Sequence, residues 1–287
     1  MASSSIAGRV LLSVLAHPDD ESFGMGGTLA LYASRGVQTH LICATRGEAG
    51  EVAPEHLQGF DSIAERRESE LRCAAGILQL AGVYFLGYRD SGMAGSPDNR
   101  HPNALAAQPM EAVAEKIVHY IRLVKPQVVL TFDPIGGYKH PDHIAVHNAT
   151  VRAFQLAGDP AYSGDLPPYQ PDKLYFHIIP KTYLKVAVLL LRLLGRDPQR
   201  FGRNADIDLA SIVEDGKFPT HARINCHTVA KEKQAAAACH ASQLGGALPR
   251  RGIFSYLSRW LALTETFMRA YPPPPPHLRE SDLFEGL

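Results

Sequence analysis

The stretch VLLSVLAHPDDE, residues 10–21, decides the fold, because an apolar run ends there abruptly in a cluster of polar side chains. An apolar run like that at residues 10–16 is typical of a central strand, buried on both faces, in a parallel sheet. The cluster His-Pro-Asp-Asp-Glu follows where this strand should end. Parallel α/β sheets bind their ligands outside the carboxyl ends of the strands. The stretch therefore predicts a strand and an adjoining site together.

Short apolar runs alternate with helical periods through the rest of the first half. Strands are predicted at residues 37–44, 83–86 and 127–132, and helices at residues 26–34, 61–80, 111–124 and 144–156. This alternation indicates right-handed crossovers and a parallel sheet that is covered on both faces. We therefore expect an α/β, Rossmann-like fold with a mostly parallel sheet, helices on both faces and the active site at the carboxyl ends of the strands.

The pattern weakens beyond a Pro- and Gly-rich break at residues 157–172. A strand is predicted at residues 174–179 and an Ala-rich helix at residues 228–243, and five consecutive prolines at 272–276 predict a stiff, extended spacer. We expect one domain. Residues 1–287 form the domain, residues 8–157 its α/β core with the polar motifs, and residues 172–287 a part that completes the sheet and covers the pocket.

The composition excludes several classes of protein. Hydrophobic residues make up 45% of the 287 residues and charged residues 20%, which excludes disordered and collagen-like chains. Lys and Arg number 29 and Asp and Glu number 29, so the formal net charge is zero. That balance argues against a protein that binds nucleic acid or a membrane surface mainly by charge.

No membrane span or signal peptide is predicted. The most apolar run, residues 186–194, contains Arg192 and is far shorter than the ~20 residues that a span needs. We predict a buried or subunit-facing helix there, which allows a homo-oligomer. The four cysteines form no C-x-x-C pair and indicate a reducing compartment rather than a disulfide scaffold. A cytoplasmic location is therefore expected.

A second polar cluster, GGYKHPDH at residues 136–143, follows the fourth predicted strand. Histidine and aspartate are ligands of Zn²⁺ and similar cations, and two histidines with one carboxylate leave coordination positions open for catalysis. Loops at strand ends are also often polar, and Asp-rich turns often cap the helix that follows. Two such clusters at matching positions favour the metal site over these structural explanations.

Five stretches together resemble the LmbE-like, or PIG-L, family of metal-dependent N-deacetylases. They are AHPDDE at 16–21, TRGEAGEV at 45–52, GYRDSGMAG at 87–95, GGYKHPDH at 136–143 and CHASQ at 239–243. GYRDSGMAG resembles more narrowly the branch that contains the mycothiol-pathway deacetylase and the mycothiol S-conjugate amidase. The resemblance implies Zn²⁺ as the cofactor, with Fe²⁺ able to use the same ligands.

The resemblance also assigns roles at the metal site. It implies His17, Asp20 and His143 as the metal ligands and Asp19 as the general base. His140 corresponds to the residue that assists the tetrahedral intermediate and the leaving amine. We expect it to act as a cation that Asp142 orients, and Tyr138 corresponds to a mobile residue that reaches the oxyanion.

Three further residues correspond to positions that contact substrate. Arg67 and Asp90 match residues that hold the sugar, and Glu51 lies where some members contact the aglycone. A surface arginine and a turn aspartate are the alternative interpretations of the first two. Lys139 occupies a position where the family often has a small residue. The shape of the pocket mouth is therefore expected to differ in detail from the family pattern, whereas the metal site is not affected.

The leading hypothesis is hydrolysis of the N-acetyl amide of an N-acetylglucosaminyl conjugate, a small-molecule amino-sugar partner. Alternatives are an amidase acting on a larger thiol S-conjugate and, more remotely, a non-haem Fe(II) oxygenase, since two histidines and a carboxylate also define that site. A nucleotide-binding module is disfavoured because no G-x-G-x-x-G follows the first strand.

Three features stay open on the sequence alone. His147 is expected near the metal ligands without contacting the metal, or in solvent. His240 lies either over the site or on the surface. The pair Gly26-Gly27 is predicted to allow close helix–strand packing rather than to bind a phosphate.

Overall fold

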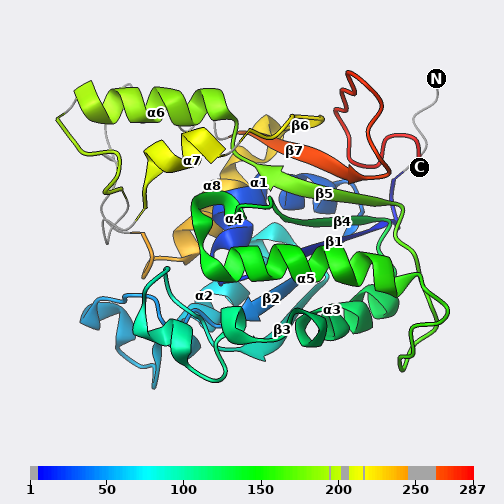
Figure 1. The fold of residues 1–287 in the computed structure, drawn as a ribbon, viewed down its shortest axis with the longest axis horizontal. Coiled ribbons are helices and arrows are strands. Elements are labelled where there is room, and N and C mark those ends of the chain that lie inside the picture. The colour runs from blue at the N-terminus through cyan, green and yellow to red at the C-terminus, as the bar shows by residue number, and fades with distance from the viewer. Residues whose placement is uncertain (1–5, 194, 202–206, 216, 245–262) are drawn as a thin grey trace.

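The computed structural model describes residues 6–193, 195–201, 207–215, 217–244 and 263–287 (Figure 1). The strands are β1 (Val10–Leu15), β2 (Gln38–Thr45), β3 (Gly82–Tyr88), β4 (Val128–Phe132), β5 (Lys173–Ile178), β6 (Ala222–Asn225) and β7 (Thr264–Tyr271). The helices are α1 (Asp20–Ser34), α2 (Ile63–Leu78), α3 (Met110–Val124), α4 (Gly136–Lys139), α5 (Pro141–Ala157), α6 (Lys181–Leu193), α7 (Leu209–Asp215) and α8 (Ala230–Cys239).

The seven strands form one sheet in the order β3-β2-β1-β4-β5-β7-β6. Strands β3, β2, β1, β4 and β5 are parallel, and β7 is antiparallel to both of its neighbours. The chain runs outward in one direction from β1 to β3 and in the other from β4 to β5. The switch point therefore lies between β1 and β4, where ligands bind in open α/β sheets.

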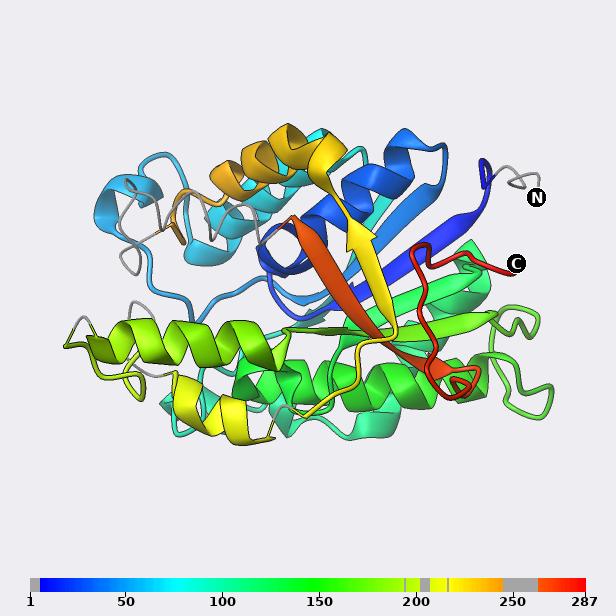
Figure 2. The same cartoon turned by 90° about the horizontal axis from the view of Figure 1, so that it is seen from above.

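Helices cover both faces of this sheet. In Figure 2, α1, α2 and α8 lie on one side of the strands, and α3 and α5 lie on the other. The fold is thus α/β and Rossmann-like with a mostly parallel sheet, as the alternating pattern predicts. The part of the chain after residue 172 supplies β5, β7 and β6 to the same sheet.

Two helices begin at least three residues earlier than predicted, and both do so inside a polar motif. The predicted helix at residues 26–34 begins at Asp20, and a kink at Met25 interrupts it. The helix predicted at residues 144–156 begins at Pro141. Proline is favoured at the first position of a helix because the missing N–H has no partner there. Both motifs therefore place their last residues in the first turn of a helix.

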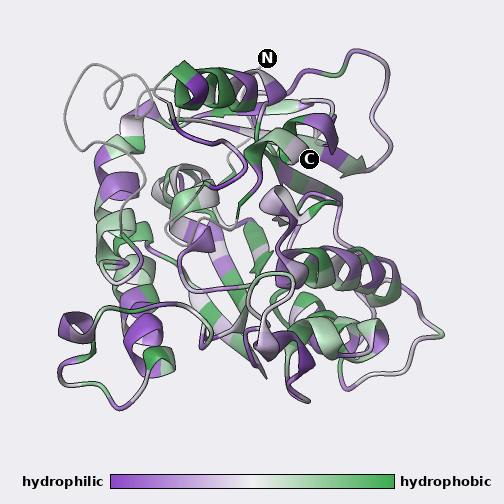
Figure 3. Ribbon diagram, turned by 60° about the vertical axis from the view of Figure 1, so that its left-hand side comes forward, coloured by the Kyte–Doolittle hydropathy of each residue, from purple (hydrophilic) through white to green (hydrophobic). Residues whose placement is uncertain are grey.

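The apolar run of α6 is only partly buried. Leu184, Val188 and Leu191 pack against α7, whereas Val186 and Leu189 are exposed, and α6 is largely green in Figure 3. The helix is therefore amphipathic rather than fully buried, and its contact with another subunit stays a prediction. Residue 194, the end of the predicted run, lies outside the described residues. No helix among the described residues is long and apolar enough to span a membrane.

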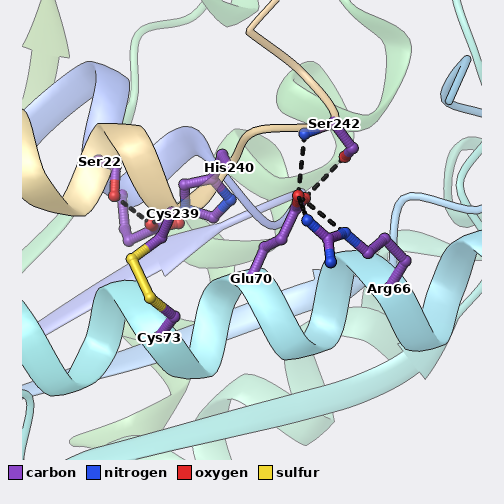
Figure 4. Close-up of a disulfide and its surroundings, with 8 residues drawn as sticks. Ser22, Arg66, Glu70, Cys73, Cys239, His240 and Ser242 are labelled. Atoms are coloured by element: carbon purple, nitrogen blue, oxygen red, sulfur yellow. Dashed lines mark hydrogen bonds and ion pairs between the residues drawn. A yellow bond between two sulfur atoms is a disulfide. The ribbon is translucent and has the colours of Figure 1, made fainter. Parts of the chain in front are cut away.

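Two cysteines that were expected to be isolated are joined. Cys73 of α2 and Cys239 at the end of α8 form a disulfide, with their Cα atoms 5.9 Å apart (Figure 4). The expectation of isolated cysteines is wrong for this pair, because two positions 166 apart in sequence carry no local signal of their contact. Cys43 and Cys226 are free and buried.

The Gly26-Gly27 pair serves packing, as predicted. A Cβ atom on Gly27 would lie 2.6 Å from the Cβ atom of Cys226, so only glycine lets α1 approach this closely. Next to it, the buried carboxylate of Glu265 in β7 accepts hydrogen bonds from the backbone N–H of Gly27 (2.9 Å) and Thr28 (2.7 Å). The carboxylate thus satisfies N–H groups just beyond the kink of α1 and fixes β7 to that helix. Lys233 contacts it as well, at 2.6 Å.

We expect Glu265→Gln to lower the free energy of unfolding by about 3 kcal/mol, because an amide nitrogen would face one of these two N–H donors and a buried ion pair would lose its anion. Urea denaturation measures the change. Glu214→Gln, at an exposed position of α7, is the control. Equal stability of the two variants would contradict the role given to this carboxylate.

Candidate active site

Side chains from the loops after β1 and β4 meet at the switch point. Nδ1 of His17 lies 3.2 Å from Nε2 of His143, and this nitrogen lies 3.3 Å from Oδ1 of Asp20. Oδ2 of Asp20 lies 3.5 Å from Nδ1 of His17. A tetrahedral zinc ion with bonds of about 2.0–2.1 Å separates its ligand atoms by about 3.3 Å. The two imidazole nitrogens are therefore spaced as two ligands of one such cation would be, and each has one oxygen of Asp20 within 3.5 Å.

The second nitrogen of His17 faces a different group. Nε2 lies 3.1 Å from Oδ2 of Asp142 and 3.4 Å from Oδ1 of Asp90. A histidine that ligates a metal commonly donates its other N–H to a carboxylate, which fixes the ring. Two groups of buried side chains could each hold a metal ion, one of His17, His140 and His143 and the other of His17, Asp90 and Asp142. Nδ1 of His17 faces His143 and Asp20, and its Nε2 faces Asp142 and Asp90.

Carboxylates set the charge state of this group. Burial lowers the pKa of His17, but Asp90, Asp142 and Asp20 outweigh it and hold the pKa well above its ordinary value. Burial raises the pKa of Asp20, but His143 and His17 outweigh it and hold the pKa well below its ordinary value. The site thus concentrates negative charge around imidazole nitrogens, which suits a divalent cation.

Asp19 is the more open of the two adjacent aspartates, with 18% of its side chain exposed against 11% for Asp20. Its backbone has φ 126°, a conformation that costs a residue with a side chain about 1–3 kcal/mol. Oδ2 of Asp19 accepts a hydrogen bond from Arg67 at 3.1 Å. Burial raises the pKa of Asp19 to about 6, with Arg67 opposing the rise and Asp20 adding to it.

Arg67 of α2 is buried, and protein atoms hold most of its guanidinium. It donates to the carbonyl oxygens of Gly47 (2.9 Å) and Pro18 (2.8 Å) as well as to Asp19. Its Nη1 lies 3.9 Å from Oδ2 of Asp90, which is also buried. Both residues predicted to hold a sugar thus border the candidate metal group, while Nε of Arg67 has no partner among the described residues.

His140 is not arranged as the sequence interpretation expected. Its Nδ1 accepts a hydrogen bond from the backbone N–H of Asp142 at 3.2 Å, whereas the Asp142 carboxylate accepts from His17 and from the backbone N–H of Ser91. Burial, with His17 and His143 nearby, lowers the pKa of His140 to about 2. The expectation that the Asp142 carboxylate orients His140 is therefore wrong, whereas a cationic His140 stays a prediction. Because Nδ1 accepts this hydrogen bond, the ring can carry a proton on Nε2.

Tyr138 lies beside the histidines, with its ring centroid 4.9 Å from that of His143. Burial raises the pKa of Tyr138, and Asp20 raises it further, so the hydroxyl keeps its proton. The ring also packs against the apolar cluster of α6 and α7. Lys139 reaches Asp215 of α7 at 2.6 Å, which ties the motif to these two helices.

Glu51 and His147, which were expected near the site, differ in their exposure to solvent. Glu51 is exposed in the loop after β2, and its contact with an aglycone stays a prediction. His147 is buried, and its Nδ1 lies 2.8 Å from the carbonyl oxygen of Phe132. It therefore packs behind the site rather than in solvent.

The sequence interpretation did not assign Glu21 and left His240 open. Both are fully buried, and Nε2 of His240 lies 2.7 Å from Oε1 of Glu21. Burial lowers the pKa of His240, but Glu21 outweighs it and raises the pKa above its ordinary value. Glu21 is the last residue of the AHPDDE motif, and His240 belongs to the CHASQ motif. Both residues therefore lie in motifs that the sequence singles out, but nothing in the sequence indicates that they contact each other.

The fold and the geometry define a Rossmann-like α/β protein with a buried group able to bind a metal. A profile of the family described as PIG-L: GlcNAc-PI de-N-acetylase matches residues 12–154. The 1D-myo-inositol 2-acetamido-2-deoxy-alpha-D-glucopyranoside deacetylase of Streptomyces griseus subsp. griseus is 38% identical over 290 residues, covering 97% of this chain and 89% of that protein. The chain belongs to the PIG-L family.

Solved structures share the fold at lower identity. The N,N'-diacetylchitobiose deacetylase from Pyrococcus horikoshii matches with a TM-score of 0.60 and 19% identity, over 91% of this chain and 83% of that chain. The 4-carboxy-2-hydroxymuconate hydratase from Pseudomonas putida KT2440 matches with a TM-score of 0.59 and 20% identity, over 94% and 99%. Enzymes of two different names share this fold, so the fold alone does not define a reaction.

We expect Gly136→Ala to weaken the binding of a divalent cation by about tenfold or more, as loss of a contact that orients a metal ligand typically does. A Cβ atom on Gly136, whose φ is +66°, would lie 2.8 Å from the Cβ atom of His143. Gly137→Ala is the matched control, because Gly137 has φ +67° but nothing within 4 Å of such a Cβ atom. Calorimetric titration of metal-stripped protein with Zn²⁺ measures both, and equal affinities would contradict the expectation.

Proposed function

We propose that this protein is a metal-dependent hydrolase that removes the acetyl group from an N-acetylglucosaminyl conjugate, releasing acetate and a free amine. The observation that carries the proposal is the spacing of 3.2–3.5 Å among His17, Asp20 and His143, beside the more open carboxylate of Asp19. Three protein ligands leave a coordination position free, as catalytic metal sites require.

The substrate class is proposed from the relatives. Curated relatives at 35–38% identity over 82–99% of this chain are named deacetylases of an N-acetylglucosaminyl inositol. We propose the same class here, a small amino-sugar conjugate whose N-acetyl group reaches the switch point between β1 and β4. A conjugate of this kind is the partner. The cytoplasmic location stays a prediction, and the Cys73–Cys239 disulfide removes the unpaired cysteines on which it was based.

The metal is proposed to be Zn²⁺, held by His17, Asp20 and His143, with Fe²⁺ able to use the same ligands. When bound, such a cation polarises the amide carbonyl and makes water acidic enough to attack near neutral pH. Asp19 takes the proton from the attacking water, because its pKa of about 6 lies near the working pH of a general base. The ion pair with Arg67 keeps its carboxylate aimed and ionised.

The proton that Asp19 takes from water is also the one that the leaving amine needs. Water loses one proton to Asp19 as it adds to the carbonyl carbon. The C–N bond then breaks, and Asp19 returns this proton to the leaving amine, so no other acid is needed. His140 donates its Nε2–H, and Tyr138 its hydroxyl, to the oxygen that becomes negative in the transition state. Loss of one such donor typically costs about 3–4 kcal/mol in the barrier.

We expect Asp19→Asn to lower kcat/KM for acetate release from N-acetylglucosaminyl inositol by about 10²–10⁴-fold, because an amide cannot accept the water proton. The variant keeps the shape of the side chain and should fold normally. Asp61→Asn, at an exposed position before α2, is the control and should stay fully active. A variant at position 19 with wild-type activity would exclude this residue as the base.

Removal of the metal tests the cofactor. We expect a chelator to abolish acetate release, and Zn²⁺ added back to restore it, because the amide carbonyl and the water depend on the Lewis acid. Metal analysis of protein purified without air decides between Zn²⁺ and Fe²⁺. Undiminished turnover by protein that contains no detectable metal would refute the proposed chemistry.

The thiol S-conjugate amidase stays a second candidate because it would use the same residues on a larger amide. Rates on an N-acetyl sugar and on a cysteinyl amide of the same conjugate separate the two activities. A faster cysteinyl amide would replace the deacetylase proposal and leave the roles of Asp19 and His140 unchanged.

A further inference from the structure

Glu21 holds the backbone of the proposed base from a fully buried position. Its Oε2 accepts a hydrogen bond from the backbone N–H of Asp19 at 3.0 Å. Its Oε1 accepts from the hydroxyl of Ser22 and contacts Nε2 of His240 at 2.7 Å. Both oxygens of Glu21 are therefore used inside the protein, and neither needs to face the substrate.

His240 comes from a remote turn that two clamps fix to α2. The disulfide between Cys73 and Cys239 holds the residue before it, as Figure 4 shows. The buried carboxylate of Glu70 accepts hydrogen bonds from the backbone N–H (2.9 Å) and hydroxyl (2.7 Å) of Ser242 just after it. The turn is thus held on both sides of His240, which fixes where its ring can lie.

We propose that His240 is a positioning residue for the deacetylation: through Glu21 it holds the backbone N–H of Asp19 and so aims the Asp19 carboxylate at the attacking water. The proposal rests on the proposed function, in which Asp19 is the base. It concerns residues that touch neither the substrate nor the metal.

The backbone of Asp19 explains why such a device is needed. Its φ of 126° is unfavourable for a residue with a side chain and persists only where neighbours impose it. The carbonyl oxygen of Asp19 accepts the N–H groups of Ser22 (3.0 Å) and Phe23 (2.9 Å), which fixes the peptide after it. The bond to Glu21 fixes the peptide before it. The direction of the carboxylate follows from these two peptides and from Arg67.

Without a donor at position 240, the carboxylate of Glu21 would be buried with one partner fewer. Buried charges need such partners, and a carboxylate that lacks one moves or binds water. Either change releases the N–H of Asp19 and lets its carboxylate turn away. Misplacement of a catalytic group by about 1 Å can lower turnover by about 100-fold.

The test compares two variants of similar volume in the metal-loaded full chain. His240→Gln keeps an N–H donor for Glu21, whereas His240→Leu removes it. We expect His240→Leu to lower kcat for acetate release by about 10- to 100-fold with little change in KM or in bound metal, and His240→Gln to recover part of the loss. Amide hydrogen exchange of the peptide that contains residues 16–23 should become faster in His240→Leu.

His40→Leu is the matched control. His40 is buried at the start of β2, and its side chain contacts the hydroxyl of Tyr84 at 3.2 Å, so the variant also removes a buried histidine contact. Its kcat should equal that of the wild type. A wild-type kcat in His240→Leu overturns the inference, and so do equal losses in the Leu and Gln variants, because volume rather than the hydrogen bond would then matter.

Two further outcomes are distinguished. Wild-type protein that releases no acetate refutes the proposed function, whereas an active wild type with unaffected variants refutes only the inference. If His240→Leu does not fold, Glu21→Gln replaces it, because a neutral amide keeps the shape but binds the N–H of Asp19 and His240 less strongly. An unchanged kcat in folded, metal-loaded Glu21→Gln overturns the inference.

Discussion

Two imidazole nitrogens and one carboxylate lie within 3.5 Å of one another in the buried switch point between β1 and β4. Such a group is costly to bury because its polar atoms lose water. Here the cost is offset by a ring of partners, with Asp142 and Asp90 at the far nitrogen of His17. A bound divalent cation would offset it further. The surrounding loops and helix ends supply the hydrogen-bond partners that these buried polar atoms need.

Each side chain proposed to act in the reaction or to bind the metal is oriented by a hydrogen bond to a neighbouring protein group. Asp142 aims His17, a backbone carbonyl at Gly136 lies 3.2 Å from Nδ1 of His143, and Arg67 aims Asp19. Most of these supports come from positions remote in sequence, and α2 supplies Arg67. Side chains locked in this way can keep a catalytic geometry without rearranging during the reaction. Removal of one support should therefore affect turnover more than binding.

The fold and the site could be predicted to different depths. The parallel core followed from apolar runs and helical periods, and the two polar motifs fell at matching strand ends. The partner of each side chain did not follow, because a motif fixes which residues are near one another but not which atom faces which. The Asp142 carboxylate accordingly contacts His17 rather than His140, which caps α5 instead. The Cys73–Cys239 disulfide was missed for a different reason, because no local pattern indicates that these two remote cysteines meet.

The sequence by itself determined the class of fold, the edge of the sheet that carries the site and the residue types present there, because strand burial and periodicity are local properties of the chain. Only the tertiary structure decided which side chains pair, that the backbone N–H of Asp142 donates to His140 and that His240 reaches Glu21. Those outcomes depend on burial and on distances between segments more than a hundred residues apart. Both are set when the two faces of the sheet are covered, and neither is written in a local pattern.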